Sequence, residues 1–162
     1  MQVARTAIEI AEANGWADDP IIVPALVIQA YELVWMGDFE AAERRLERAD
    51  RALPAAGEPV IELVARYAQG LLRFGRGRLE EALEALSAAE SVRQRLSKHI
   101  LTVDPRVQLI EVQVRLGETD AAAAALAEMS SEERDRAEMR LAAAAVHLGE
   151  GDPERALAVL RP

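Results

Sequence analysis

The stretch LVIQAYELVWMGDFEAAERRLERADRALP, from Leu26 to Pro54, sets the pattern that the rest of the chain repeats. Apolar residues recur on both sides of Gly37 with helical spacing, so each side predicts one helix with one buried face. These residues are Leu26, Ala30 and Leu33 before the glycine, and Phe39, Ala42, Leu46 and Ala49 after it. Gly37 is expected to form the turn, because glycine adopts positive φ without a Cβ clash. Pro54 is expected to end the second helix.

The same phase returns along the whole chain. Small residues recur, with spacings of 38, 40, 40 and 34, at Ala4, Ala42, Ala82, Ala122 and Ala156. A large aliphatic residue follows each of them by four positions: Ile8, Leu46, Leu86, Leu126 and Leu160. Further small or flexible residues stand three positions on, at Ala11, Ala49, Ala89 and Met129, and turn glycines recur at Gly37, Gly77, Gly117 and Gly151. A period of this length predicts an all-α, right-handed solenoid of antiparallel helix pairs.

This pattern resembles the tetratricopeptide repeat (TPR). The residues that carry the resemblance are Leu26-x2-Gln29-Ala30-x2-Leu33, then Gly37-x-Phe39-x2-Ala42-x3-Leu46-x2-Ala49, then Pro54. An aliphatic residue stands where that repeat usually has tryptophan. The 40-residue spacing, the sequence NGWADDP at residues 14–20 and the Ala/Arg/Leu-rich style resemble a narrower group. That group is the TPR-like region of MalT-like transcriptional regulators of the LuxR family.

We expect one TPR-like solenoid domain over residues 1–162. Its expected parts are a half-unit at 1–19, units at about 20–57, 58–103 and 104–130, and a truncated unit at 131–162. Both ends stop within a unit, which indicates a fragment of a longer array. Ser130 and Glu133 resemble a capping box for the first helix of the truncated unit. Residues 97–103 form the longest expected connector.

The composition is typical of a soluble, cytoplasmic domain. The chain has no cysteine, which excludes disulfide and thiolate chemistry and is compatible with a reducing interior. The N-terminus has no apolar signal core, and the longest apolar run, Ile21 to Ile28, is too short to span a bilayer. The net charge is −9, which disfavours binding to a polyanion. We therefore expect no direct nucleic acid binding and no membrane association.

The sequence contains no constellation typical of catalysis or metal binding. Neither His99 nor His147 has a second histidine or carboxylates at metal-ligand spacing, so each is interpreted as structural or solvated. A G-x-S-x-G nucleophile elbow is absent from the sequence. We predict that the protein is not an enzyme, and that it needs no metal and no cofactor.

A stripe of large side chains on the first helix of each unit is the candidate binding surface. It comprises Val27, Tyr31, Val34 and Trp35, then Tyr67, Leu71 and Phe74, then Val107, Glu111, Val114 and Arg115. The TPR resemblance implies that this side lines the concave surface of the solenoid. The candidate ligand-binding residues are Tyr31, Trp35, Tyr67, Phe74, Glu111 and Arg115, which would form an apolar groove with a polar end. The alternative is that these side chains pack against neighbouring helices, as aromatic stripes at helical spacing usually do.

The resemblance implies a non-catalytic sensor module of a MalT-like, LuxR-family regulator. Its implied ligand is a small-molecule inducer, a peptide or a protein in the concave groove. Its other implied partners are a nucleotide-binding switch and a DNA-binding helix-turn-helix in the parent regulator. The alternative is a free-standing TPR adaptor that docks a peptide or protein.

Self-association through the terminal helices is a further expectation. The stripe of Ala4, Ile8 and Ala11 is expected to be half covered, and Leu157 and Leu160 to have few neighbours. Exposed apolar surface of this kind tends to find a partner.

Overall fold

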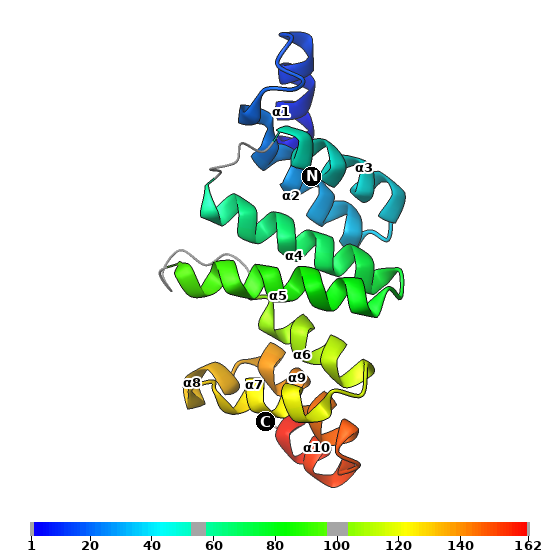
Figure 1. The fold of residues 1–162 in the computed structure, drawn as a ribbon, viewed down its shortest axis with the longest axis vertical. Helices are drawn as coiled ribbons and strands as arrows, with labels where there is room; N and C mark the ends of the chain where they lie inside the picture. Colours follow the sequence, from blue (N-terminus) through cyan, green and yellow to red (C-terminus); the bar gives the residue numbers. More distant parts are fainter. Residues whose placement is uncertain (1, 53–57, 97–103, 162) are drawn as a thin grey trace. The chain divides into compact units, whose positions relative to one another are not determined.

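The computed structural model describes residues 2–52, 58–96 and 104–161, and every regular element within these ranges is a helix (Figure 1). The chain divides into two compact units, Met1–Val103 and Asp104–Pro162. The predicted all-α fold of repeated helix pairs is confirmed. That residues 1–162 form one continuous domain with the unit boundaries given above stays a prediction. Pro54, His99 and the connector at 97–103 lie outside the described residues.

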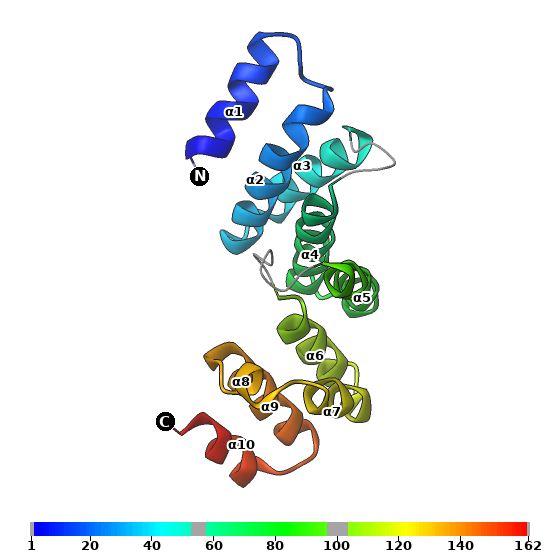
Figure 2. The ribbon, with the colours of Figure 1, turned by 90° about the vertical axis from the view of Figure 1, so that its left-hand side faces the viewer.

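The first unit contains a lone helix and two helical hairpins. Its elements are α1 (Gln2–Ala13), the 3-10 helix η1 (Pro20–Ile22), α2 (Val23–Trp35), α3 (Phe39–Ala52), α4 (Pro59–Gly75) and α5 (Leu79–Arg95). Figure 2 shows α1 beside α2, and the helices α2 and α3 form the hairpin predicted from Leu26–Pro54. Helix α4 packs against α2 and α3 as well as against its own partner α5.

Each helical hairpin is closed by a glycine in the left-handed region. Gly37, Gly77, Gly117 and Gly151 have φ between +73° and +80°. The amide one residue after each glycine donates a hydrogen bond back to a carbonyl of the preceding helix. These bonds run from Asp38 to Leu33 (3.0 Å), Arg78 to Arg73 (2.9 Å), Glu118 to Gln113 (2.8 Å) and Asp152 to His147 (2.8 Å). This is the Schellman cap, which needs positive φ and therefore favours glycine.

Burial in the first unit follows the predicted phase. The repeated small residues Ala42 and Ala82 have no exposed surface, and the large aliphatic Leu86 four positions on from the second has none either. Ala4, Ile8 and Ala11 of α1 are also buried, at 3–7% exposure, and Ile8 and Ala11 belong to a core cluster with Leu26 and Val27. The expectation that the α1 stripe is half covered is therefore wrong, because α2 and η1 already cover it.

The second unit repeats the hairpin twice, with one extra turn of helix between. Its elements are α6 (Arg106–Arg115), α7 (Thr119–Ala127), α8 (Ser131–Arg134), α9 (Ala137–Gly149) and α10 (Pro153–Leu160). Its core joins α6, α7 and α9 through buried residues that include Ile110, Met129, Met139 and Val146. Leu157 and Leu160 on α10 remain 60% and 43% exposed.

The capping box at Ser130 and Glu133 is present, but it caps a different helix from the one predicted. The Ser130 hydroxyl accepts from the Glu133 amide, and the Glu133 carboxylate accepts from the Ser130 amide. The helix that these bonds start is α8, which ends after four residues at Arg134. The longer helix α9 begins separately at Ala137. Sequence spacing alone does not distinguish a cap that starts one turn from a cap that starts a full helix.

Close helix packing in the second hairpin predicts the effect of a substitution at Gly70. A Cβ built on Gly70 lies 2.6 Å from Cγ of Leu86, whose side chain is fully buried. At an exposed helical site a Gly-to-Ala change stabilises by roughly 0.5–1 kcal/mol. Here we expect Gly70→Ala to destabilise by about 1–3 kcal/mol, because the core must move to accept the methyl group. Urea denaturation measures the difference.

The double variant tests the assigned contact. Leu86→Ala alone should cost about 2–5 kcal/mol. The loss in Gly70→Ala, Leu86→Ala should be less than the sum of the two, since the shorter side chain makes room. Arg44→Ala, at an exposed position, should stay within about 0.5 kcal/mol as a control. A stabilising Gly70→Ala would contradict this packing.

Candidate functional site

Three of the four predicted aromatic residues lie together in the first unit. The rings of Tyr31 and Trp35 on α2 meet edge to face, with centroids 6.2 Å apart and planes at 71°. The rings of Tyr31 and Tyr67 lie 6.0 Å apart at 32°, which joins α2 to α4. Phe74 is half-buried and stands two helical turns beyond Tyr67 on α4. Edge-to-face and offset geometries are the favourable ones for aromatic pairs.

These aromatic residues differ in how far they reach solvent. Tyr67 is buried at 5% exposure, whereas Trp35 is 64% exposed. Val27 and Leu71, which the sequence places on the same stripe, are buried core residues. Part of the stripe therefore packs against neighbouring helices, as the alternative interpretation holds, and its solvent end is at Trp35.

The exposed end of this stripe is wider than the sequence analysis indicated. Ile28, about one turn before Tyr31 on α2, is 48% exposed, and Met36, the C-cap residue of α2, is 60% exposed. We call Ile28, Tyr31, Trp35 and Met36 the α2 surface. Ile28 stands seven positions before Trp35, which is a helical spacing, and Met36 follows Trp35 directly; neither residue belongs to the stripe predicted from sequence.

The predicted polar residues form an ion pair with each other in the second unit. The Arg115 guanidinium lies 2.7 Å from the Glu111 carboxylate, four positions apart on α6. Their side chains are 55% and 36% exposed, and a pair of this kind is worth only a few tenths of a kcal/mol. That they form the polar end of a ligand groove stays a prediction.

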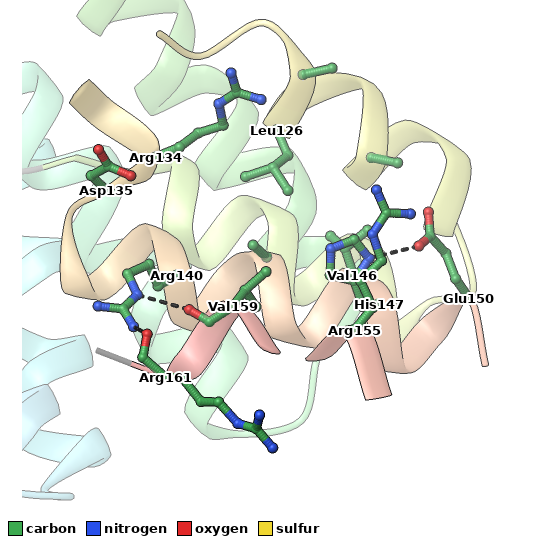
Figure 3. A pocket seen from close by; sticks show the side chains of 13 residues that line it. Leu126, Arg134, Asp135, Arg140, Val146, His147, Glu150, Arg155, Val159 and Arg161 are labelled. Carbon is green, nitrogen blue, oxygen red and sulfur yellow. Dashed lines mark hydrogen bonds and ion pairs between the residues drawn. The ribbon is translucent and has the colours of Figure 1, made fainter. Parts of the chain in front are cut away.

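A pocket that the sequence analysis did not predict lies in the second unit (Figure 3). Helices α7, α9 and α10 form its walls, with α8 at one side, and its volume is about 680 Å³. Its apolar lining includes Leu126, Val146 and Val159. Four arginines and two acidic residues also line it: Arg134, Arg140, Arg155, Arg161, Asp135 and Glu150. In a protein with a net charge of −9, this lining is unusual in its excess of cations.

Two of the charged groups are held by neighbours. The Arg140 guanidinium donates to the Val159 carbonyl at 2.8 Å and also to the carbonyl of Arg161, which fixes the end of α10. His147 Nδ1 lies 2.9 Å from Glu150 Oε2, and both residues line the pocket. Among the residues that the structure describes, the guanidinium groups of Arg134, Arg155 and Arg161 have no hydrogen-bond or ion-pair partner. No clear signal for them exists in the sequence, because Glu138 stands four positions after Arg134 and only the break between α8 and α9 separates the two.

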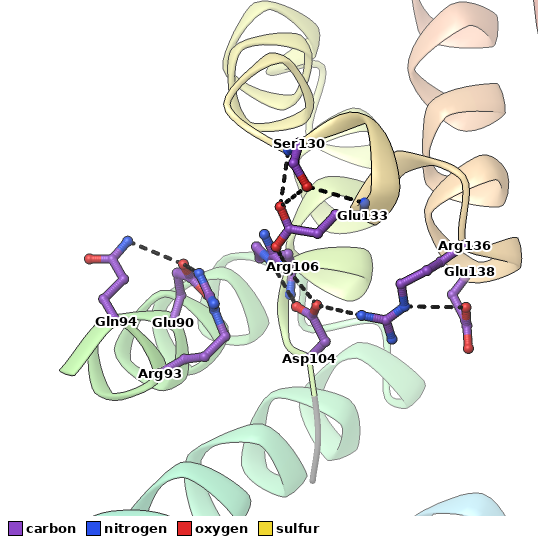
Figure 4. A network of polar contacts seen from close by, with 9 residues as sticks. All are labelled: Glu90, Arg93, Gln94, Asp104, Arg106, Ser130, Glu133, Arg136 and Glu138. Carbon is purple, nitrogen blue, oxygen red and sulfur yellow. Dashed lines mark hydrogen bonds and ion pairs between the residues drawn. The ribbon is translucent and has the colours of Figure 1, made fainter. Parts of the chain in front are cut away.

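A polar network fixes α8, and with it one side of the pocket (Figure 4). Arg106 at the start of α6 contacts Asp104 at 2.7 Å and Glu133 at 3.0 Å, and all three side chains are largely shielded from water. Arg136, which follows α8, also contacts Asp104, with the guanidinium and the carboxylate 3.5 Å apart. Because Arg134 and Asp135 follow directly on Glu133, this network sets the position of both pocket residues.

Hydrogen bonds hold the pKa of Glu133 far below its usual value. The Ser130 amide and hydroxyl, followed by the Arg106 guanidinium, lower the pKa of Glu133 to about 2. The hydrogen bonds that the Arg106 guanidinium donates to the Asp104 carboxylate raise the pKa of Arg106, so that residue stays charged. The pair of Arg106 and Glu133 is therefore ionised throughout the neutral and mildly acidic range.

In residues 2–52, 58–96 and 104–161, no three His, Asp or Glu side chains cluster as a metal site would require. Of the helices in these ranges, none combines the length and apolar character needed to cross a bilayer.

The lowered pKa of Glu133 predicts a specific loss of stability in acid. A group whose pKa falls on folding stabilises the folded state above its unfolded pKa, and that stabilisation disappears as pH falls toward the folded pKa. The contribution of Glu133 should therefore be complete above about pH 5 and gone near pH 2. Urea melts of the protein and of Glu133→Gln should differ at pH 7 and converge as the pH falls through this window. A difference that stays constant with pH would contradict the ionic role of this network.

Comparison with known proteins gives one family. Residues 63–88, 104–128 and 137–162 each match the tetratricopeptide repeat, and together they cover just under half of the chain. The matches fall on the hairpins α4–α5, α6–α7 and α9–α10. No curated protein and no solved structure matches the chain. These three segments are therefore similar to tetratricopeptide repeats, which generally mediate protein interactions.

Proposed function

We propose that this chain is a non-catalytic module that binds a protein partner, and that the partner docks on the α2 surface. Tetratricopeptide repeats generally bind proteins, which supports the class of function. The observation that carries the proposed site is the exposure of Trp35, 64% of whose surface is open to solvent beside Met36 at 60%. Tryptophan and tyrosine are the residues that most often dominate binding energy at protein interfaces.

The geometry of the α2 surface supports docking of an apolar peptide segment. Tyr31 contacts both Trp35 and Tyr67, and Tyr67 is anchored in the core of the first unit. The exposed ring of Trp35 is therefore held at one edge, which lowers the entropy lost when a partner covers it. A segment with apolar anchors and basic flanks fits best, because the net charge of −9 attracts cations.

We further propose, from the resemblance of the repeat spacing and of residues 14–20, that the module is the sensor of a MalT-like regulator. In that setting a small-molecule inducer or a peptide would occupy the solenoid, and the other domains of the regulator would respond in the cytoplasm. The alternative is a free-standing adaptor with the same surface. The two differ in the parent gene, because a regulator also encodes nucleotide-binding and DNA-binding segments. We also propose that two copies of the chain associate through α10, a contact that the exposure of Leu157 supports.

Substitution of Trp35 tests the docking site. Peptides selected from a phage-displayed library on the intact protein should lose roughly 2 kcal/mol or more of binding free energy with Trp35→Ala, since the indole supplies the largest contact. Isothermal titration calorimetry measures the change. Trp16→Ala is the matched control, because Trp16 is also half exposed but lies outside the α2 surface.

Equal effects of Trp35→Ala and Trp16→Ala would show that the peptides recognise exposed tryptophan and no particular site. Peptides that bind with full affinity to Trp35→Ala would overturn the α2 surface as the docking site. Thermal melts of both variants control for folding, and neither should change much, since both side chains are largely exposed.

The proposed role in a regulator predicts that this chain has no DNA affinity of its own. Its net charge of −9 opposes the counterion release that drives non-specific binding. Fluorescence anisotropy of a labelled duplex should stay unchanged at micromolar protein near physiological salt. Binding under these conditions would contradict both the charge argument and the division of roles among the domains of a regulator.

A further inference from the structure

Each unit contains a groove at the same place in the repeat. In the first unit the groove lies between α3 and the α4–α5 hairpin, and in the second it lies between α7 and the α9–α10 hairpin. We call them the first groove and the second groove. The turn glycines fix the correspondence, because Gly37 and Gly77 flank the first groove as Gly117 and Gly151 flank the second.

The lining residues correspond position by position when counted from these glycines. Glu43, Leu46 and Glu47 on α3 correspond to Ala123, Leu126 and Ala127 on α7; Gln69, Leu72 and Glu81 correspond to Ala143, Val146 and Arg155. Both grooves therefore have an aliphatic floor, formed by Leu46 and Leu72 in the first and by Leu126 and Val146 in the second. The polar residues of the first groove listed above are replaced by alanines, or by an arginine in the case of Glu81.

The first groove is filled by its own side chains. Arg76 reaches across it to Glu43 at 2.6 Å. Gln69, which is only 8% exposed, donates to both carboxylate oxygens of Asp50 at 3.0 and 3.2 Å. The space left over is about 150 Å³. Acidic and basic groups neutralise one another there, so this groove offers a ligand neither room nor charge.

The second groove is open because alanines stand where those polar side chains would be. Ala123, Ala127 and Ala143 end at Cβ, and the space between the helices is about 680 Å³. This volume lies within the range of small-molecule sites, roughly 300–1,000 Å³. The short helix α8, which the first groove lacks, adds Arg134 to the rim.

The exchange also changes the balance of charge, because four acids and three arginines line the first groove whereas four arginines and two acids line the second. The α3 acids have no acidic counterpart on α7 and Glu81 is replaced by Arg155, while Glu150 stands in place of Arg76. Arg134 and Arg155 stand at the second groove with no acidic partner among the described residues, and Arg161 lines it from the end of α10 with its side chain pointing away from these two (Figure 3). Guanidinium groups bind carboxylate and phosphate through paired hydrogen bonds.

We propose that the second groove binds a small organic anion, a molecule with a carboxylate or phosphate group on a compact apolar body. The oxyanion would lie against the arginines, and the apolar body against Leu126, Val146 and Val159. This site is independent of the proposed protein-docking surface, which lies on α2 in the other unit. It also differs from the stripe of first-helix residues predicted from sequence.

Naphthalene probes separate the two halves of this proposal. 1-Naphthyl phosphate and 1-naphthoate carry both an oxyanion and an apolar body, inorganic phosphate carries only the charge, and 1-naphthol carries only the apolar body. Titrations of the intact protein followed by amide NMR shifts should place both naphthyl anions on residues 123–161. The naphthyl anions should bind roughly tenfold or more tightly than phosphate or naphthol. Comparison of the two naphthyl anions decides whether the site prefers phosphate or carboxylate.

Variants on α7 and α9 test the location with a matched control. Ala127→Glu gives the groove the acid of the first groove, and Ala143→Gln gives it the amide. Each should weaken binding of the preferred anion by roughly tenfold or more. Ala124→Glu makes the same charge change on α7 at an exposed position outside the groove, so binding should change by about twofold at most. Ala127→Glu keeps the test valid if Ala143→Gln misfolds, since Ala127 is exposed.

Three results would overturn the proposal. The first is that neither naphthyl anion shifts any amide of residues 123–161 at millimolar concentration. The second is that inorganic phosphate binds as tightly as the naphthyl anions, which would show only a basic surface. The third is that Ala127→Glu and Ala124→Glu weaken binding equally, which would show a long-range charge effect and no pocket.

Discussion

The hydrogen bond that closes each glycine turn constrains everything else in the structure. It joins the amide after the glycine to the carbonyl five residues earlier, as between Asp38 and Leu33 at 3.0 Å or Asp152 and His147 at 2.8 Å. A bond of this kind fixes where one helix ends and sets the direction in which the next begins. Because the same bond recurs in every hairpin, residues at the same distance from the glycine face the same neighbours. The small and large apolar residues of the repeat are buried for that reason.

The same constraint extends to contacts between successive hairpins. Gly75 lies two residues before its turn glycine, and a Cβ there would lie 2.6 Å from the Phe39 ring of the previous hairpin. Gly149 holds the corresponding position in the second unit, and a Cβ there would lie 3.0 Å from Thr119. At the third such position stands Trp35, whose ring is exposed. The position two residues before the turn glycine thus has no room for a side chain at Gly75 or Gly149, whereas the same position in the first hairpin carries the exposed Trp35.

Sequence reasoning predicted the helices and their register because both depend on local spacing and on the turn glycines. It predicted the burial of Ala42 and Leu86 because both stand at apolar positions of the repeat, but it did not predict that other elements cover Ile8. The burial of Ile8 depends on η1, which comes from a different part of the chain. Helix α8 was missed for a related reason, since its single turn gives no periodicity and its network with Arg106 joins residues far apart in sequence.

The second groove was missed because a cavity is a property of facing surfaces. Ala123 and Ala143 are each ordinary helix residues, and neither marks a site when considered alone. Only their joint position across the groove leaves space, and that position is known once the helices are placed. The aromatic residues were easier, since Tyr31 and Trp35 are conspicuous in a chain with few aromatics. Which of these aromatic residues are buried and which are exposed could be known only from the packing of the helices in the structure.

The charge of the whole chain limits what the second groove can select. A net charge of −9 repels anions at long range, so the arginines must act over short distances. At physiological salt the field of distant charges is screened within about 8 Å, whereas groups in contact with a ligand are screened much less. A small anion in the proposed site would therefore interact chiefly with the arginines that line it, such as Arg134 and Arg155. A nucleic acid extends far beyond the groove and meets the acidic surface as well. The same arginines can favour a small anion in a protein that repels a long polyanion.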